Sequence, residues 1–313
     1  MRFVHEPIDF EVYIGGCGDA AVDSRGRIFA ISIPYPVTIF GQDGKLIKRW
    51  PEGIIGCAHG IYIDEADYVY IVDSDWHLLT KFSPEGEILM RIGSRGVRSD
   101  TGAEKGNYKT IRWGAPPFYA PSKVTVSPWG EIFVTDGYGN SRVHRFSAEG
   151  KLLASWGEPG GGPGQFRLPH GIGVDKDNRV YVADRENDRV QIFDVEGQVL
   201  DIWNNINRPD GICVRDDLVY VAELGHIAYN DNVMYELYEN MPWSQVVVFD
   251  TGGCEITRFG GEDPWREGNL YSAHGANLDR EGNLYIADSG LPDSNFVPDG
   301  RRRHALQKFK RIG

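Results

Sequence analysis

Residues 170–198, HGIGVDKDNRVYVADRENDRVQIFDVEGQ, contain the pattern that decides the fold. Three short runs rich in β-branched and aromatic residues, GIGV, VYVA and VQIF, are separated by the polar turns DKDNR and DRENDR. Runs of this kind, bounded by Asp, Asn and Gly, are typical of antiparallel strands joined by tight turns. The stretch therefore predicts three consecutive strands of one sheet, and DVEGQ predicts the turn into a fourth.

The same phrase recurs along the whole chain. Each copy places a β-rich run before a strand that ends in phenylalanine, and the six phenylalanines are Phe40, Phe82, Phe146, Phe193, Phe249 and Phe309. A fixed period of four short strands indicates a propeller rather than a sandwich or a barrel. The sequence therefore predicts an all-β, six-bladed β-propeller with four-stranded blades, in which residues 1–313 form a single domain.

The two ends of the chain are predicted to meet in one blade. Only four residues follow Phe309, so the last repeat lacks its fourth strand. The N-terminal stretch FEVYIGG, residues 10–16, is similar to the ends of fourth strands elsewhere, such as RFGG. We expect this N-terminal strand to close the last blade and so to remove the free sheet edges that invite aggregation.

Composition and charge exclude several classes of partner. The chain is 41% hydrophobic and 25% charged, as expected of a globular protein, and its formal net charge of -12 repels nucleic-acid backbones and anionic membranes. No apolar run approaches the roughly 18 residues that span a bilayer, and residues 1–12 lack the apolar stretch of a signal peptide. We expect a cytoplasmic protein with no nucleic-acid and no membrane partner.

Three histidines open nearly identical phrases, HGIYID at His59, HGIGVD at His170 and HGANLD at His274. They begin the innermost strands of alternate predicted blades, so the near-sixfold symmetry points all three imidazoles at the central axis. The equivalent positions of the other blades are Gly18, Ser122 and Asp210. Three imidazoles that leave a coordination position open suit a catalytic Zn²⁺ or another divalent transition metal, whereas a single aligned histidine would be structural.

The longer connections fall on the face where these histidines lie, and they are residues 94–120, 158–169, 225–243 and 290–303. Two turns of the same face, DGYGNSR from Asp136 and DRENDR from Asp184, carry unusual residues. Tyr138 can exchange a proton with an oxygen near a metal, and Arg185 can hold a carboxylate or a carbonyl. The alternative for Asp184, Asn187 and Arg189 is that they bond the neighbouring backbone.

At these residues the chain resembles the peptidyl-α-hydroxyglycine α-amidating lyases, six-bladed relatives of the NHL-repeat propellers. The resemblance is carried by residues 136–158, 162–174 and 182–193, by HGIYID, and by the spacing of Asp73 and His77, so it covers the central half of the chain. It implies an NHL-type propeller with zinc on His59, His170 and His274, Tyr138 as the catalytic base and Arg185 beside the substrate.

The resemblance also implies a reaction. The family splits a carbinolamide, R–CO–NH–CH(OH)–COOH, into a primary amide and glyoxylate. Zinc polarises the hydroxyl oxygen, the tyrosine removes its proton, and the C–N bond breaks as the carbonyl forms, so that no water is consumed.

Three positions depart from the family. Ser32 stands where the family has an active-site arginine, Gly139 replaces a cysteine, and Gly275 follows His274 where the family has an acidic calcium ligand, so the sequence does not favour a structural Ca²⁺. The cations that could replace the missing arginine lie in the first and last insertions and are Arg98, Arg112, Arg301, Arg302 and Arg303. The candidate substrate-binding residues are therefore Arg112, Arg301, Arg302, Ser32 and Asp210.

The sequence thus predicts a metal-dependent carbon–nitrogen lyase that acts on a small α-hydroxy-amide and releases an aldehyde such as glyoxylate. A first alternative is a propeller hydrolase of the lactonase, esterase or amidase type, in which the metal activates water. A second is an NHL-repeat scaffold that binds a protein partner and has no activity, because a fold does not determine a function. Metal retention separates the scaffold from both enzymes.

Overall fold

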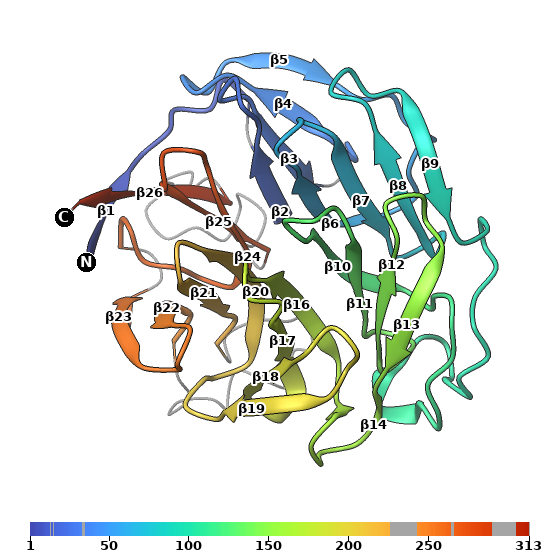
Figure 1. The fold of residues 1–313 in the computed structure, drawn as a ribbon. Coiled ribbons are helices and arrows are strands. Elements are labelled where there is room, and N and C mark those ends of the chain that lie inside the picture. Colours follow the sequence, from blue (N-terminus) through green and yellow to red (C-terminus); the bar gives the residue numbers. More distant parts are fainter. Residues whose placement is uncertain are drawn as a thin grey trace.

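The computed structural model describes residues 1–12, 14, 16–32, 35–225, 243–263, 266–289 and 305–312. Six four-stranded antiparallel sheets surround a central axis, with one strand of each sheet near the axis and one at the periphery (Figure 1). The prediction of an all-β, six-bladed β-propeller with four-stranded blades is confirmed.

Each blade runs outward from the axis in sequence order. Blade one consists of β2 (Cys17–Val22), β3 (Ile28–Ser32), β4 (Thr38–Phe40) and β5 (Leu46–Arg49), and blade two of β6 (Ala58–Ile63), β7 (Val69–Asp73), β8 (Leu78–Phe82) and β9 (Ile88–Ile92). Blade three consists of β10 (Pro121–Val126), β11 (Ile132–Asp136), β12 (Arg142–Phe146) and β13 (Leu152–Trp156), and blade four of β16 (Pro169–Val174), β17 (Val180–Asp184), β18 (Arg189–Phe193) and β19 (Val199–Trp203). Blade five consists of β20 (Pro209–Arg215), β21 (Leu218–Glu223), β22 (Gln245–Asp250) and β23 (Glu255–Gly260).

Blade six joins the two ends of the chain. It consists of β24 (Ala273–Leu278), β25 (Leu284–Asp288), β26 (Leu306–Ile312) and β1 (Arg2–Glu6), and the termini lie side by side in Figure 1. An N-terminal strand closes the ring as expected. The prediction that residues 10–16 form this strand was wrong, because β1 pairs with β26. Phe3 in β1 stacks on Phe259 of blade five at 5.2 Å between ring centroids, whereas Phe10 packs against Phe40 at 4.9 Å in the core of blade one. Phe10 therefore fills the core and does not extend a sheet edge.

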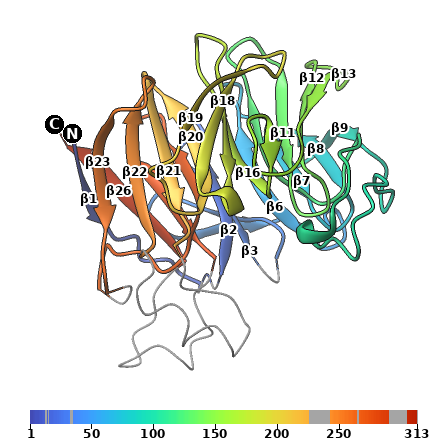
Figure 2. The ribbon, with the colours of Figure 1, turned by 90° about the horizontal axis from the view of Figure 1, so that it is seen from below.

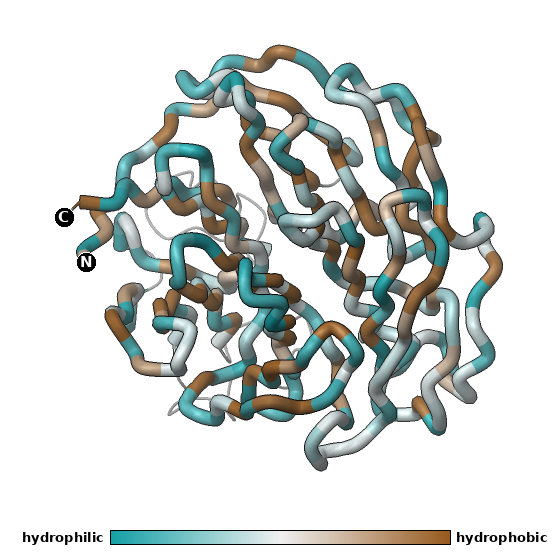
Figure 3. The backbone as a smooth tube through the Cα atoms, viewed as in Figure 1, coloured by the Kyte–Doolittle hydropathy of each residue, from teal (hydrophilic) through white to brown (hydrophobic). Residues whose placement is uncertain are grey.

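The core lies between neighbouring blades. The second strand of each blade is almost wholly buried, and hydrophobic stretches recur in every blade of Figure 3. The repeat phenylalanines, Phe40, Phe82, Phe146, Phe193, Phe249 and Phe309, are at most 3% exposed. Burial of one such side chain stabilises the fold by about 1.5–3 kcal/mol. The phenylalanine therefore recurs in the sequence because each blade needs it to pack against its neighbour.

The two faces of the ring carry different connections between strands. Figure 2 shows the ring from the side. The inner strands begin on one face, together with the turns that join second and third strands and the short 3₁₀ helices η1 (Tyr108–Thr110) and η2 (Arg185–Asn187). β14 (Glu158–Pro159) and β15 (Gln165–Phe166) form a small parallel pair in the connection between blades three and four. Among the described residues, no helix has the length and hydropathy needed to cross a membrane.

Candidate metal centre

The three repeat histidines meet at the axis. His59, His170 and His274 begin β6, β16 and β24, and each offers a ring nitrogen within 4.8 Å of those of the other two. Their ring centroids lie 4.7–5.1 Å apart, and His170 and His274 are buried. Because alternate blades supply the rings, the arrangement has the approximate threefold symmetry that the repeat predicts.

The opposite nitrogen of each ring bonds a backbone carbonyl of the next blade. The Nδ1 atoms of His59, His170 and His274 lie 2.8, 3.3 and 2.6 Å from the carbonyl oxygens of Ser122, Asp210 and Gly18, respectively. A carbonyl can only accept, so each Nδ1 donates its proton and each Nε2 keeps a lone pair. Metal-binding histidines commonly fix the second nitrogen in this way.

Electrostatics keep the imidazoles neutral. Burial lowers the pKa of His170 and of His274 to about 3 and holds the pKa of His59 well below its usual value. Neutral imidazole is the form that binds a metal. Three neutral rings that direct nitrogen lone pairs toward one point are a donor set that fits a divalent transition metal.

Tyr138 and Arg185 stand beside the histidines. The hydroxyl of Tyr138, from the turn between β11 and β12, lies 3.0 Å from Nε2 of His59 and 3.2 Å from Nε2 of His170. Nη1 of Arg185, in η2, lies 3.5 Å from the same hydroxyl, and the guanidinium carbon lies 5.7 Å from the centre of the tyrosine ring. The two residues singled out from the turns therefore lie where the metal centre would be.

Asp210 connects the histidines to the arginine. Its buried carboxylate contacts Nδ1 of His170 and lies 3.3 Å from Nη1 of Arg185. Burial acts to raise the pKa of Asp210, but the hydrogen bond from His170 and the positive charge of Arg185 hold it well below its usual value. The carboxylate is therefore charged, and in this structure it orients protein side chains.

Sequence reasoning missed Glu186 and Arg208. Oε1 of Glu186 accepts from Nε of Arg185 and from Nη2 of Arg208, at 2.9 Å in both cases. This shared carboxylate fixes the guanidinium of Arg185 from the side opposite Asp210. Neither residue type recurs at the equivalent positions of the neighbouring blades, so no repeated residue in the sequence marks it.

Three other polar residues of the DRENDR turn have structural contacts. One oxygen of Asp184 accepts from Nδ2 of Asn187 and Nε of Arg189, at 2.8 Å each. Arg189 also donates to the backbone oxygens of Gly161 and Gly162, at 2.9 and 2.8 Å. These three side chains therefore fasten the connection between blades three and four.

Ser32, Arg98 and Arg112 are the remaining candidates for substrate binding that lie in the described part of the chain. Ser32 ends β3 opposite Cys17, and the exposed Arg112 packs beside Gly102. Arg98 donates to the hydroxyl of Tyr119 at 2.6 Å. The candidates Arg301, Arg302 and Arg303 lie outside the described residues, as does most of the 225–243 connection.

A glycine follows each histidine because the inner strands touch there. A Cβ atom added to Gly60 would lie 2.7 Å from the carbonyl oxygen of Ser122, and one added to Gly171 or Gly275 would overlap Asp210 or Asp19. The close approach lets each Nδ1 reach the carbonyl of the next blade. The repeated His-Gly pair is thus a steric requirement of the site.

Replacing Gly171 with alanine is expected to push β16 away from β20. Overpacking of this kind costs about 1–3 kcal/mol, so the melting temperature should fall together with the capacity to bind metal. The matched control is Gly161→Ala, where the nearest atom would be Oδ1 of Asn187 at 3.7 Å. Thermal melting and metal titration of both variants test this, and equal behaviour of the two would contradict it.

Comparisons with known proteins agree with the fold. Residues 118–146 and 166–193, in blades three and four, match the NHL repeat family model. The chain is 30% identical to human NHL repeat-containing protein 3 over 216 residues, which are 64% of this chain and 58% of that protein. It is 32% identical over 161 residues, 50% of this chain and 42% of the relative, to a probable peptidyl-alpha-hydroxyglycine alpha-amidating lyase of Caenorhabditis elegans.

A solved structure of streptogramin B lyase superposes with a TM-score of 0.62 at 13% identity, covering 98% of this chain and 97% of that one. At this identity the likeness concerns the fold alone. The chain spans less than two thirds of the length of either curated relative named above. It is a six-bladed propeller that carries NHL repeats and has NHL repeat-containing protein 3 and amidating lyases among its relatives.

Proposed function

We propose that this chain is a metal-dependent carbon–nitrogen lyase for a small carbinolamide, R–CO–NH–CH(OH)–COOH. His59, His170 and His274 would hold the ion, Zn²⁺ or a similar divalent transition metal. When bound, such an ion supplies Lewis acidity at an oxygen of the substrate. The observation that carries the proposal is the Tyr138 hydroxyl, which lies within 3.2 Å of the Nε2 atoms of both His59 and His170.

Tyr138 is the proposed base. Its oxygen takes the proton of the substrate hydroxyl, the electron pair of the broken O–H bond forms the second bond of the glyoxylate carbonyl, and the C–N pair leaves with the amide nitrogen. The same oxygen then returns the proton to that nitrogen, so the atoms balance without water. General acid–base catalysis of this kind contributes about 10²–10⁴-fold in rate.

Arg185 is proposed to stabilise the ionised form of this base. Burial disfavours its charged form, but the neighbouring Tyr138 and Asp210 raise the pKa of Arg185, so the guanidinium remains positive. It lies 3.5 Å from the tyrosine hydroxyl, where it favours the phenolate. Glu186 and Asp210 orient it, which leaves its remaining N–H groups for a substrate carboxylate.

Solvent-isotope labelling tests the reaction type. Zinc-loaded protein is incubated with an N-acyl-α-hydroxyglycine in H₂¹⁸O, and the amide and acid products are examined by mass spectrometry. We expect a primary amide and glyoxylate, with ¹⁸O in the aldehyde only to the extent that authentic glyoxylate exchanges in a parallel control. Label in a newly formed R–COOH would instead indicate a hydrolase, and no turnover by protein that binds no metal would favour the interaction scaffold.

A further inference from the structure

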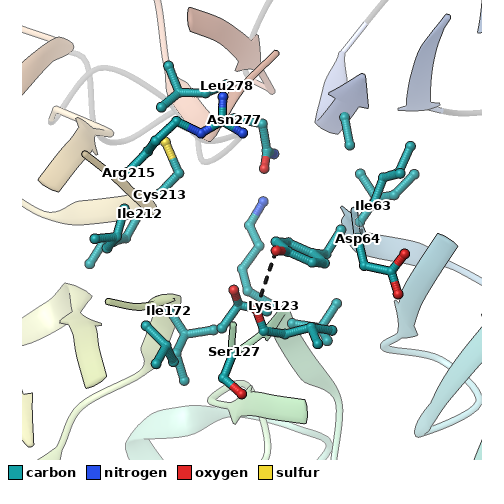
Figure 4. Close-up of a pocket in the computed structure, with 18 of the residues that line it drawn as sticks. Ile63, Asp64, Lys123, Ser127, Ile172, Ile212, Cys213, Arg215, Asn277 and Leu278 are labelled. Atoms are coloured by element: carbon teal, nitrogen blue, oxygen red, sulfur yellow. Dashed lines mark hydrogen bonds between the residues drawn. The ribbon is translucent and has the colours of Figure 1, made fainter. Parts of the chain in front are cut away.

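A buried ion pair lies on the axis directly behind the histidines. Lys123 in β10 and Asp19 in β2 are 6% and 1% exposed, and Nζ of Lys123 lies 2.8 Å from Oδ2 of Asp19. The pair stands at the inner end of a cavity of about 490 Å³ that all six blades line from the opposite face. Figure 4 shows the Lys123 side chain near the middle of the lining residues.

The carboxylate of Asp19 gathers donors from several blades. Oδ1 accepts from the backbone N–H of Ala20 and from Nδ2 of Asn277, both at 3.0 Å, and Oδ2 accepts from the N–H of Ile61 at 3.1 Å. With Lys123, these contacts join β2, β6, β10 and β24. The ion pair therefore connects blades one, two, three and six at the centre of the ring.

The same pair reaches the carbonyls that orient two of the histidines. Lys123 follows Ser122, whose carbonyl oxygen accepts from Nδ1 of His59 at 2.8 Å. Nζ of Lys123 also lies 3.5 Å from the carbonyl oxygen of Gly18, which accepts from Nδ1 of His274 at 2.6 Å. A shift of the ammonium would therefore move both carbonyls and, through them, both rings.

We propose that Lys123 is a positioning residue for the metal centre, and that its ammonium takes the place of a divalent cation at the centre of this propeller. The inference rests on the proposed metal centre. The donor set does not fit Ca²⁺, which takes about six to eight oxygen ligands, because N–H groups already occupy both oxygens of Asp19. An acidic side chain cannot be added at Gly275, since its Cβ would overlap Asp19.

Two measurements test this inference. Metal-stripped protein is melted with and without added CaCl₂, and cobalt affinity is measured by competition with a chromophoric chelator. We expect the melting temperature of the wild type to be unaffected by CaCl₂. We expect Lys123→Met to weaken Co²⁺ binding by about 10–100-fold, the usual effect of losing an outer partner of a metal site.

Two further variants keep the test decisive if Lys123→Met folds poorly. The double variant Asp19→Asn/Lys123→Met removes both buried charges, so it should melt above Lys123→Met while still binding Co²⁺ weakly. The control Lys176→Met breaks an exposed ion pair with Asp217 and should match the wild type.

Each contrary outcome has a separate meaning. A melting temperature that rises with CaCl₂ would show a calcium site and overturn the inference, because a ligand that binds the native state stabilises it. Wild-type Co²⁺ affinity in the double variant would overturn the positioning role. Failure of the wild type itself to bind Co²⁺ would overturn the proposed function, while the CaCl₂ arm would still test the internal cation.

Discussion

Replacing His170 with alanine is expected to abolish tight binding of a transition metal while the propeller stays folded. His170 is fully buried and supplies one of the three converging ring nitrogens. Loss of even an outer partner of a metal-binding histidine weakens a site by about 10–100-fold, so loss of a ligand should cost more than that. Elemental analysis of wild type and variant, purified without nickel resin, measures the change.

The control for this experiment is His5→Ala. His5 lies in β1, at the outer edge of blade six, and should leave about one metal ion per chain. Equal metal content in wild type and the His170 variant would place any bound metal elsewhere. No metal in either protein would remove the lyase mechanism.

Replacing Tyr138 with phenylalanine is expected to lower kcat on the carbinolamide by about 10²–10⁴-fold, because the variant lacks the oxygen that takes the substrate proton. Metal content should not change, since the three histidines and their carbonyl partners remain. Release of glyoxylate under saturating substrate, with metal analysis of the same samples, measures both quantities. A kcat equal to that of the wild type would contradict the assigned role.

The matched substitution is Tyr62→Phe. Tyr62 lines the cavity on the opposite face and donates to the backbone oxygen of Val126 at 3.3 Å. The substitution removes a tyrosine hydroxyl without touching the histidines, so the kcat of this variant should equal that of the wild type. A comparable loss in both variants would indicate that the effect of Tyr138→Phe arises from general damage to the propeller.

The repeat was sufficient to predict the blades and the convergence of the histidines. The convergence follows from symmetry, because residues at equivalent positions of a closed ring of repeats face the same axis. The repeat also identified Gly18, Ser122 and Asp210 as the equivalents of the histidines in the other three blades. These residues supply the carbonyl oxygens that the histidines bond. The register gave no information on the Asp210 side chain, whose contacts with His170 and Arg185 depend on neighbouring rotamers.

Features outside the repeat were harder to predict. The closing strand was predicted at residues 10–16 because FEVYIGG is similar to the ends of other fourth strands. In the structure β1 takes this place, where it pairs with β26 and where Phe3 packs on Phe259. Arg208 and Lys123 occur once each in their roles, so only the three-dimensional structure shows that they contact Glu186 and Asp19. A contact made by a residue type that does not recur from blade to blade carries no periodic signal.

Closure of the ring by β1 and β26 has a consequence for biosynthesis. A nascent chain that has emerged through blade five contains His59 and His170 but lacks His274. Its β1 is still unpaired, because β26 has not yet been made. Pairing across so long a sequence separation is slow, because the entropy of closing the loop is lost before any contact forms. The three-histidine centre therefore cannot form before β24 has joined the blades that supply His59 and His170.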